Sequence, residues 1–179
     1  TFAADAKIVP TEIQADGKVL VGEVHDPLAR VINGGVSGNA GVFSTAEDLA
    51  VIASLILNDG VVRLPSDGIK GFFGGTERVR LYSKNTVDTF TRIPAGYEEH
   101  GRALGWDIGV GHGSYMGELL TPGSLVNHSG YTGTSIAINQ QDGIAIIFLT
   151  NRVHPYDDGG VARSRATVSN IVVSAIDHQ

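Results

Sequence analysis

The sequence predicts an α+β fold in which a small antiparallel sheet is packed by helices, and two patterns carry that prediction. Two runs rich in β-branched residues, 135–138 and 144–149, flank the polar turn 139–143, which is typical of an antiparallel hairpin. Apolar residues recur at helical spacing after Ser44 and again over 161–176. The run 144–149 is apolar on both faces, so we expect a central strand that is covered on both sides.

The first half of the chain predicts one clear helix among loops. Residues 18–24 alternate weakly, as an edge strand does, and residues 34–41 form a loop with four glycines in eight positions. Ser44-Thr45-Ala46-Glu47 fits a capping box with Ser44 as N-cap, and Asp59-Gly60 ends the helix that follows. We expect 61–82, which contains Gly74-Gly75, to be an irregular insertion.

The second half predicts shorter elements around the hairpin. A short helix over 83–92 has Ser83 as its N-cap, and 103–108 is expected to be a strand, followed by a glycine-rich loop to Gly117. Trp106 is expected to lie in the core. The terminal helix over 161–176 is amphipathic, and its expected buried residues are Ala162, Ala166, Val168, Ile171, Val172 and Ala175.

Composition narrows the classes of function. The 179 residues suit a single domain, and a net charge of -6 argues against nucleic acid as a partner. The absence of cysteine excludes disulfides, Cys-ligated zinc and thiol nucleophiles. The sequence holds no apolar run long enough for a membrane span. It begins at Thr1 rather than Met, so we expect that a preceding segment is missing.

The segment 127–136 is the most informative for chemistry. A polar triplet, Asn127-His128-Ser129, and two glycines lie where a strand is expected to start, and glycine in a strand indicates close approach of a ligand or another backbone. A histidine and a hydroxyl there suit substrate binding, and the next backbone amide suits an oxyanion donor. The alternative is a strand edge with a solvated histidine.

A resemblance to a known family is carried by four segments of the sequence, 34–49, 128–130, 149–155 and 161–163. In this order they resemble the serine β-lactamase and penicillin-binding-protein superfamily, in its class C-like branch of low-molecular-weight D,D-peptidases and esterases. His128-Ser129-Gly130 resembles the Lys-Thr-Gly strand motif in its His-x-Gly form. The dipeptide His25-Asp26 also occurs in relatives of the D,D-carboxypeptidase type. The other three similar segments are Gly34–Leu49, Leu149–Pro155 and Val161–Arg163.

The motifs that carry the nucleophile, Ser-x-x-Lys, and its partner base, Tyr-x-Asn or Ser-x-Asn, have no properly placed match in the sequence. No serine has a lysine three residues later, and no tyrosine has an asparagine two residues later. Ser37-Gly38-Asn39 and Ser83-Lys84-Asn85 match Ser-x-Asn only as strings. The resemblance therefore implies that residues 1–179 are the C-terminal half of a transpeptidase-like catalytic domain. Its N-terminal half, with the Ser-x-x-Lys serine, is the expected partner, and this chain alone should be inactive.

The resemblance also implies site residues. Tyr131 is expected to lend its backbone N–H to the oxyanion hole, while His128 replaces the family's lysine as a catalytic residue. Ser129 is expected to hydrogen-bond the substrate, and Gly130 to leave room for the acyl chain or to serve the loop conformation. Asn39 is expected to line the cleft or to form a turn.

The remaining charged residues also have predicted roles. Arg152 and Arg163 suit a substrate carboxylate, with surface or packing roles as the alternative. His25 and Asp26 are expected to form a pair that supports the glycine-rich loop. No metal or other cofactor is expected, because no metal-binding spacing occurs among His25, His112, His128, His154 and Asp26.

The resemblance therefore implies part of a serine hydrolase that forms a covalent acyl-enzyme on a peptide, amide or ester. The histidine in place of lysine favours a D,D-carboxypeptidase, D-aminopeptidase or esterase over an efficient β-lactamase, although a β-lactam-like molecule still fits as a substrate. The alternative is a non-catalytic module that binds peptidoglycan or another ligand, or an inactive fragment of that fold. The resemblance implies a periplasmic, cell-surface or secreted location.

Overall fold

The computed structural model describes residues 7–64, 77–109, 116–157 and 159–176. The chain divides into two compact units. One unit, which we call the sheet unit, comprises Thr45–Ser129, Ser135–Phe148 and Ala162–Gln179. The other, which we call the loop unit, comprises Thr1–Ser44, Gly130–Thr134 and Leu149–Val161.

The centre of the sheet unit is a four-stranded antiparallel sheet in the order β3-β4-β5-β6. Neighbours in the sheet are also neighbours in the chain, and in the middle of the sheet Asn127, Ala137 and Ile146 lie opposite one another. The strands are β3 (Asp107–Ile108), β4 (Leu125–Ser129), β5 (Ser135–Asn139) and β6 (Ile144–Phe148). The predicted hairpin around the turn 139–143 is therefore confirmed.

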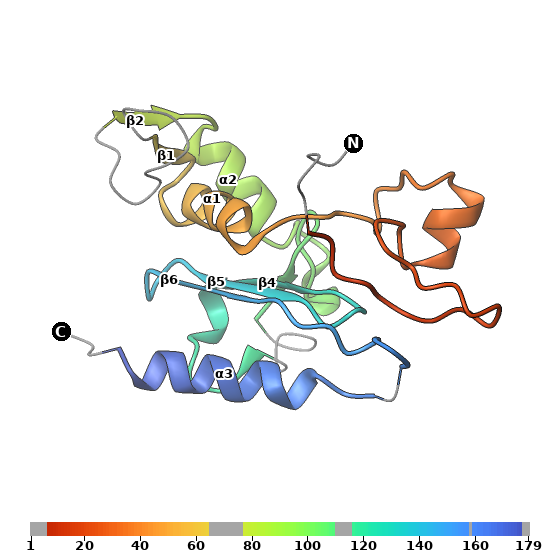
Figure 1. The fold of residues 1–179 in the computed structure, drawn as a ribbon. Helices are drawn as coiled ribbons and strands as arrows, with labels where there is room; N and C mark the ends of the chain where they lie inside the picture. The colour runs from red at the N-terminus through yellow and green to blue at the C-terminus, as the bar shows by residue number, and fades with distance from the viewer. Residues whose placement is uncertain (1–6, 65–76, 110–115, 158, 177–179) are drawn as a thin grey trace. The chain divides into compact units, whose positions relative to one another are not determined.

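Helices cover both faces of this sheet (Figure 1). The alternation of side chains along each strand assigns successive residues to opposite faces. Ile144 and Ile146 pack with Ala137 and with Val173 of α3 (Ala162–Ser174), whereas Ala145 packs on the other face. That second core is formed with α1 (Ala46–Leu57) and α2 (Lys84–Thr91), and its buried residues are Ala53, Ile56, Val87 and Ile138.

The two predicted properties of 144–149 have different outcomes. Both faces of β6 are covered, as the unbroken apolar run indicates. The strand is not central, however, because within the described residues it pairs only with β5. A run that is apolar on both faces indicates that both faces of the strand are covered. It does not indicate whether the strand has one or two neighbouring strands in the sheet.

Helix starts follow local capping, with one correction. Ser83 accepts a hydrogen bond from the Thr86 amide at 3.1 Å and caps α2, as predicted. For α1 the N-cap is Thr45 rather than Ser44, since the Thr45 hydroxyl accepts from the Asp48 amide at 3.2 Å. The four residues offer two overlapping hydroxyl caps, and the sequence alone does not choose between them.

Within 61–82, residues 61–64 and 77–80 form a second sheet, so the prediction of an irregular insertion is wrong for these residues. β1 (Val61–Leu64) pairs with β2 (Glu77–Arg80), placing Val62 opposite Val79. Gly60 precedes β1 with φ of +86°, and a side chain there would overlap the carbonyl of Tyr82. The Gly74-Gly75 pair lies outside the described residues.

Two further expectations are corrected in the sheet unit, and one is confirmed. The strand predicted over 103–108 is reduced to β3, because 103–106 form a turn in which the Ala103 amide donates to the Trp106 carbonyl. Trp106 does pack into the core on the α1 side. On α3, Ile171 is 61% exposed, while Arg165 and Ser169 are buried with Val173. Short 3₁₀ turns lie at Glu98–His100 and Pro122–Ser124.

The described part of the loop unit has little regular structure. In place of the edge strand expected over 18–24 it contains a single bridge between Ile13 and Val19. One π-helical turn, Leu28–Ile32, closes with a bond of 3.1 Å from the Asn33 amide to the Leu28 carbonyl. The Asp26 carboxylate accepts from the Ala29 amide at 2.7 Å and so stabilises the start of this turn. Residues 34–41 form the expected loop.

Candidate active site

The predicted motif lies at the end of β4. Leu125, Val126 and Asn127 are buried, whereas His128 is exposed and lies opposite Ile136 in the register. Its Nδ1 is 3.1 Å from the Ser129 carbonyl oxygen. The polar triplet therefore marks where a strand ends, not where it starts, because the buried residues precede it.

A tight loop, Gly130–Thr134, follows directly. The Gly130 amide donates to the Thr134 carbonyl at 2.8 Å, and the Gly133 amide donates to the Gly130 carbonyl at 3.1 Å. A Cβ atom on Gly130 would overlap the Thr134 hydroxyl. Of the two predicted roles of Gly130, this contact favours a role in the loop conformation over a role in leaving room for an acyl chain.

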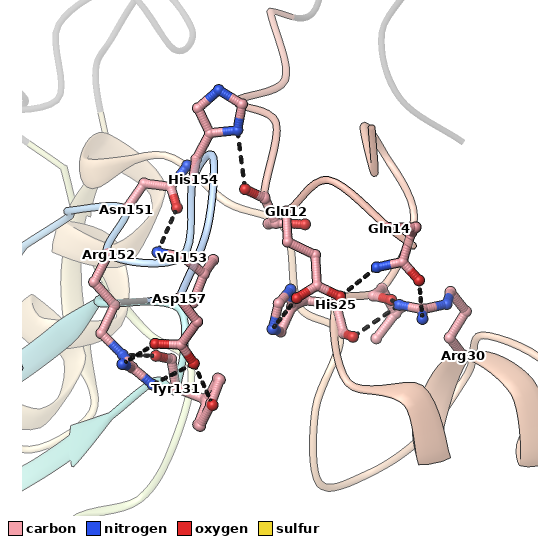
Figure 2. Close-up of polar contacts among 12 residues, drawn as sticks. Glu12, Gln14, His25, Arg30, Tyr131, Asn151, Arg152, Val153, His154 and Asp157 are labelled. Atoms are coloured by element: carbon pink, nitrogen blue, oxygen red, sulfur yellow. Dashed lines mark hydrogen bonds and ion pairs between the residues drawn. The ribbon is translucent and has the colours of Figure 1, made fainter. Parts of the chain in front are cut away.

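Tyr131, which is 64% exposed, is bound by two charged residues from the segment after β6 (Figure 2). Its hydroxyl donates to Asp157 Oδ2, and its carbonyl accepts from Arg152 Nε at 2.6 Å. The Arg152 guanidinium carbon lies 4.3 Å from the ring centroid, within cation–π range. Arg152 Nη1 also donates to Asp157 Oδ1 at 2.6 Å. We call Tyr131, Arg152 and Asp157 the Tyr131 cluster.

The environment of Asp157 favours its charged form. The Tyr131 hydroxyl, followed by the Arg152 guanidinium, lowers the pKa of the Asp157 carboxyl, and partial burial opposes this shift. The ion pair is thus intact at neutral pH. All three nitrogens of the Arg152 guanidinium donate to Tyr131 or Asp157. The sequence predicted a substrate carboxylate as the partner of this side chain, whereas in the structure its partners belong to the chain itself.

His25 adjoins the same tyrosine. Its ring stacks on that of Tyr131 with centroids 5.7 Å apart, and its Nε2 lies 4.0 Å from Glu12. Its buried Nδ1 has no partner in the described part of the chain. The expected His25–Asp26 pair is not what the structure shows, since Asp26 instead caps the turn that follows.

The other predicted residues lie apart from the Tyr131 cluster or outside its unit. Asn39 is exposed in the glycine-rich loop, and its side-chain oxygen accepts from the Ser37 hydroxyl, which fits a turn. Arg163 is exposed on the first turn of α3 in the sheet unit. Across the described ranges, no group of three or more potential metal ligands occurs; His112 lies outside them. No helix within those ranges is long and apolar enough to span a membrane.

Sequence reasoning missed two members of this site, Asp157 and Glu12, as well as the role of Thr150. The Thr150 hydroxyl donates to the Gly133 carbonyl at 2.7 Å. One signal was available for Asp157: an arginine and an aspartate five residues apart flank a proline directly after a buried strand, where a turn brings the two charges together. Glu12 carries no such signal.

The sheet covered by helices, with a His-Ser-Gly sequence at a strand end, defines the class of the serine β-lactamases and penicillin-binding proteins. The family model described as Beta-lactamase matches residues 4–169, so the chain belongs to this family. The resemblance inferred from the sequence and its α+β fold are both confirmed.

Curated relatives carry the provisional name D-alanyl-D-alanine carboxypeptidase. Proteins of that name from Salmonella typhi, Salmonella newport and Salmonella agona are 36% identical to this chain over 138 residues. The match covers 75% of this chain and 28% of each relative, so the chain spans little more than a quarter of their length. No solved structure matches the chain significantly.

Proposed function

We propose that this chain is part of a serine hydrolase of the D,D-carboxypeptidase type that acts on a peptide, amide or ester. In that enzyme the chain supplies the His-Ser-Gly strand and a backbone N–H that stabilises the oxyanion. The observation that carries the proposal is the exposed end of β4, where His128 and Ser129 lead directly into the tight loop of Tyr131. Membership of the β-lactamase family and 36% identity to proteins named as D,D-carboxypeptidases support it.

The reaction assigned to the complete enzyme is acyl transfer. A serine Oγ attacks the substrate carbonyl, its proton passes to a base, and the tetrahedral oxyanion is stabilised by backbone N–H groups. The carbon–leaving-group bond then breaks as the protonated base returns the proton to the leaving group, and water later hydrolyses the serine ester. No Ser-x-x-Lys sequence occurs in the 179 residues, so the proposal assigns nucleophile and base to the N-terminal half of the domain as partner.

The Tyr131 amide is the proposed oxyanion donor on this chain. Its N–H has no acceptor in the part of the chain that the structure describes. The Gly130–Tyr131 peptide is planar, so this N–H points away from the Gly130 carbonyl, which accepts from Gly133. A donor that is fixed and unpaired is what stabilisation of a developing oxyanion requires.

The other proposed roles concern the substrate. His128 is exposed at the strand end and is assigned to a substrate carboxylate, with the Ser129 hydroxyl as a hydrogen-bonding partner. Arg163 and Asn39 are exposed and stay as predicted substrate contacts. A peptidoglycan-type substrate implies an extracytoplasmic location, and this too is part of the proposal.

The test uses the full-length protein that contains this chain, with two covalent probes, a fluorescent penicillin and a fluorophosphonate. We expect stoichiometric labelling of a serine outside residues 1–179, and release of D-alanine from a D-Ala-D-Ala peptide. Nitrocefin hydrolysis at a rate comparable to that of dedicated β-lactamases would contradict the preference for a peptidase or esterase.

The second candidate function is a non-catalytic binding module. The absence of the nucleophile motif from this sequence favours it, because a chain acting alone would keep a ligand site without the reactive group. Binding of a D-Ala-D-Ala peptide by the full-length protein, with no adduct from either probe, would decide for this alternative.

A further inference from the structure

Three successive carbonyls of the loop Gly130–Thr134 accept hydrogen bonds from two residues that follow β6. Arg152 Nε donates to Tyr131 O at 2.6 Å, and the Arg152 amide donates to Thr132 O at 2.9 Å. The Thr150 hydroxyl donates to Gly133 O at 2.7 Å. The backbone of this loop is therefore fixed from one side, at the three peptides that follow the proposed oxyanion donor.

Close packing reinforces these bonds at Gly133. This residue has φ of +121°, and a Cβ atom there would lie 2.8 Å from the Thr150 hydroxyl oxygen and 3.0 Å from the Arg152 amide nitrogen. Gly133 in turn donates to the Gly130 carbonyl, which belongs to the peptide that bears the Tyr131 N–H. That peptide is thus linked through Gly133 to the Arg152 backbone amide and to the Thr150 hydroxyl, while the Arg152 side chain contacts the next peptide directly at Tyr131 O.

The guanidinium itself is held by its counter-ion. The Arg152 side chain is 18% exposed, and Asp157 accepts from both of its terminal nitrogens, at 2.6 and 3.4 Å. Asp157 also accepts the Tyr131 hydroxyl, which closes a ring of contacts through the three residues of the Tyr131 cluster (Figure 2). A lysine could keep the charge but could not make the planar, forked contact together with the bond to Tyr131 O.

We propose that Arg152 is a positioning residue, with Asp157 as its counter-ion, that orients the backbone amide of Tyr131 for the oxyanion. The inference rests on the proposed function for its catalytic purpose. It differs from the sequence prediction for Arg152, in which the guanidinium binds the substrate carboxylate directly. Kinetic measurements distinguish the two roles. Substitution of a positioning residue changes the rate of the chemical step, whereas substitution of a residue that binds the carboxylate changes substrate affinity.

The test measures acylation of the full-length protein by a fluorescent penicillin, over a range of probe concentrations that separates affinity from the acylation rate constant. Variants are Arg152→Ala, Arg152→Lys and Asp157→Asn, with Arg78→Ala as control because Arg78 is exposed on β2. Loss of one oxyanion donor costs about 10²–10³ in rate, so a displaced donor in Arg152→Ala should lower the rate constant by about 10–100-fold. Arg152→Lys and Asp157→Asn should lie between Arg152→Ala and the wild type, with probe affinity almost unchanged in all three.

Hydrogen exchange of the peptide containing residues 130–134, measured in the same proteins, is the second readout. We expect faster exchange in Arg152→Ala, with exchange in β5 unchanged. If Arg152→Ala weakens probe affinity and leaves the acylation rate constant unchanged, the inference is overturned in favour of direct carboxylate binding. If hydrogen exchange over 130–134 is unchanged in this variant, the inference is overturned altogether. Wild-type protein that forms no adduct would instead overturn the proposed function, and faster exchange in Arg152→Ala would then support Arg152 as the residue that orders this loop.

Discussion

The sheet unit and the loop unit are stabilised by different forces. In the sheet unit, Ile138 is fully buried and alternating side chains fill two cores, so apolar burial dominates. In the loop unit, Leu20 and Val153 are buried, but Val36 and Val42 are 86% and 89% exposed. The contacts that fix the loop around Tyr131 are hydrogen bonds and the Arg152–Asp157 ion pair. Substitutions in the sheet unit should therefore destabilise it by leaving cavities in the core. Substitutions around Tyr131 in the loop unit should instead act by removing hydrogen bonds or changing the loop conformation.

The largest effect is expected in the sheet unit, from Ile138→Ala. Ile138 has no exposed surface and packs with Ile56 and Val87, so the substitution leaves a cavity and should lower the free energy of unfolding by about 2–5 kcal/mol. The urea midpoint of the full-length protein measures it. Ile171→Ala, at a position that is 61% exposed, is the matched control and should change stability by less than about 0.5 kcal/mol. Equal effects at the two positions would contradict the description of this core.

In the loop unit the largest effect is expected from Gly133→Ala. The new side chain meets both a strained φ and the Thr150 hydroxyl, which together should cost about 1–3 kcal/mol. Faster hydrogen exchange over 130–134 and 150–152, with β5 and β6 unaffected, is the expected signature. Gly159→Ala controls for φ alone, since Gly159 has φ of +118° and a Cβ atom there would meet no other atom within 4 Å. If exchange in the β6 strand changed as much as in the loop, the two units would not be independent.

A smaller effect is expected at the start of α1. Thr45→Ala removes the hydroxyl that accepts from the Asp48 amide and should cost about 1 kcal/mol, whereas Thr45→Asp should keep most of the stability. Thermal unfolding of both variants measures the difference. Equal melting temperatures for the two would point to a different N-cap.

The smallest effect, and the only one that depends on pH, belongs to Asp157. The folded-state pKa of Asp157 lies below its ordinary value of 3.8, so its contribution to stability is present above that pH and is lost as pH falls through the lowered pKa. The difference in urea midpoint between wild type and Asp157→Asn should thus be constant from pH 7 to about 5 and shrink toward pH 2. A difference that grows as the pH falls would show that the carboxyl has a raised pKa.

The contrast between the units also explains what the sequence could predict. Local patterns located five elements: apolar spacing indicated α1 and α3, the N-cap Ser83 indicated α2, and a polar turn between β-branched runs indicated β5 and β6. The site was predicted in part: Tyr131 and Arg152 were both named, and the structure brings them together. Asp157 was not named, although its spacing from Arg152 across Pro155 was a usable local signal. Glu12 was not named either, because contacts between loops depend on chain paths that no local pattern encodes. The same limit explains why β1 and β2 were missed.

The order of the strands has a consequence for how the chain reaches this structure. β4, β5 and β6 are each joined to the next by a few residues, so their pairing closes only short loops and should form early. The contact between α1 and the hairpin is different: Gln140 Nε2 donates to the Ile56 carbonyl at 2.9 Å across a sequence separation of 84 residues. Substitutions in the hairpin should consequently slow folding, whereas substitutions in α1 should mainly speed unfolding.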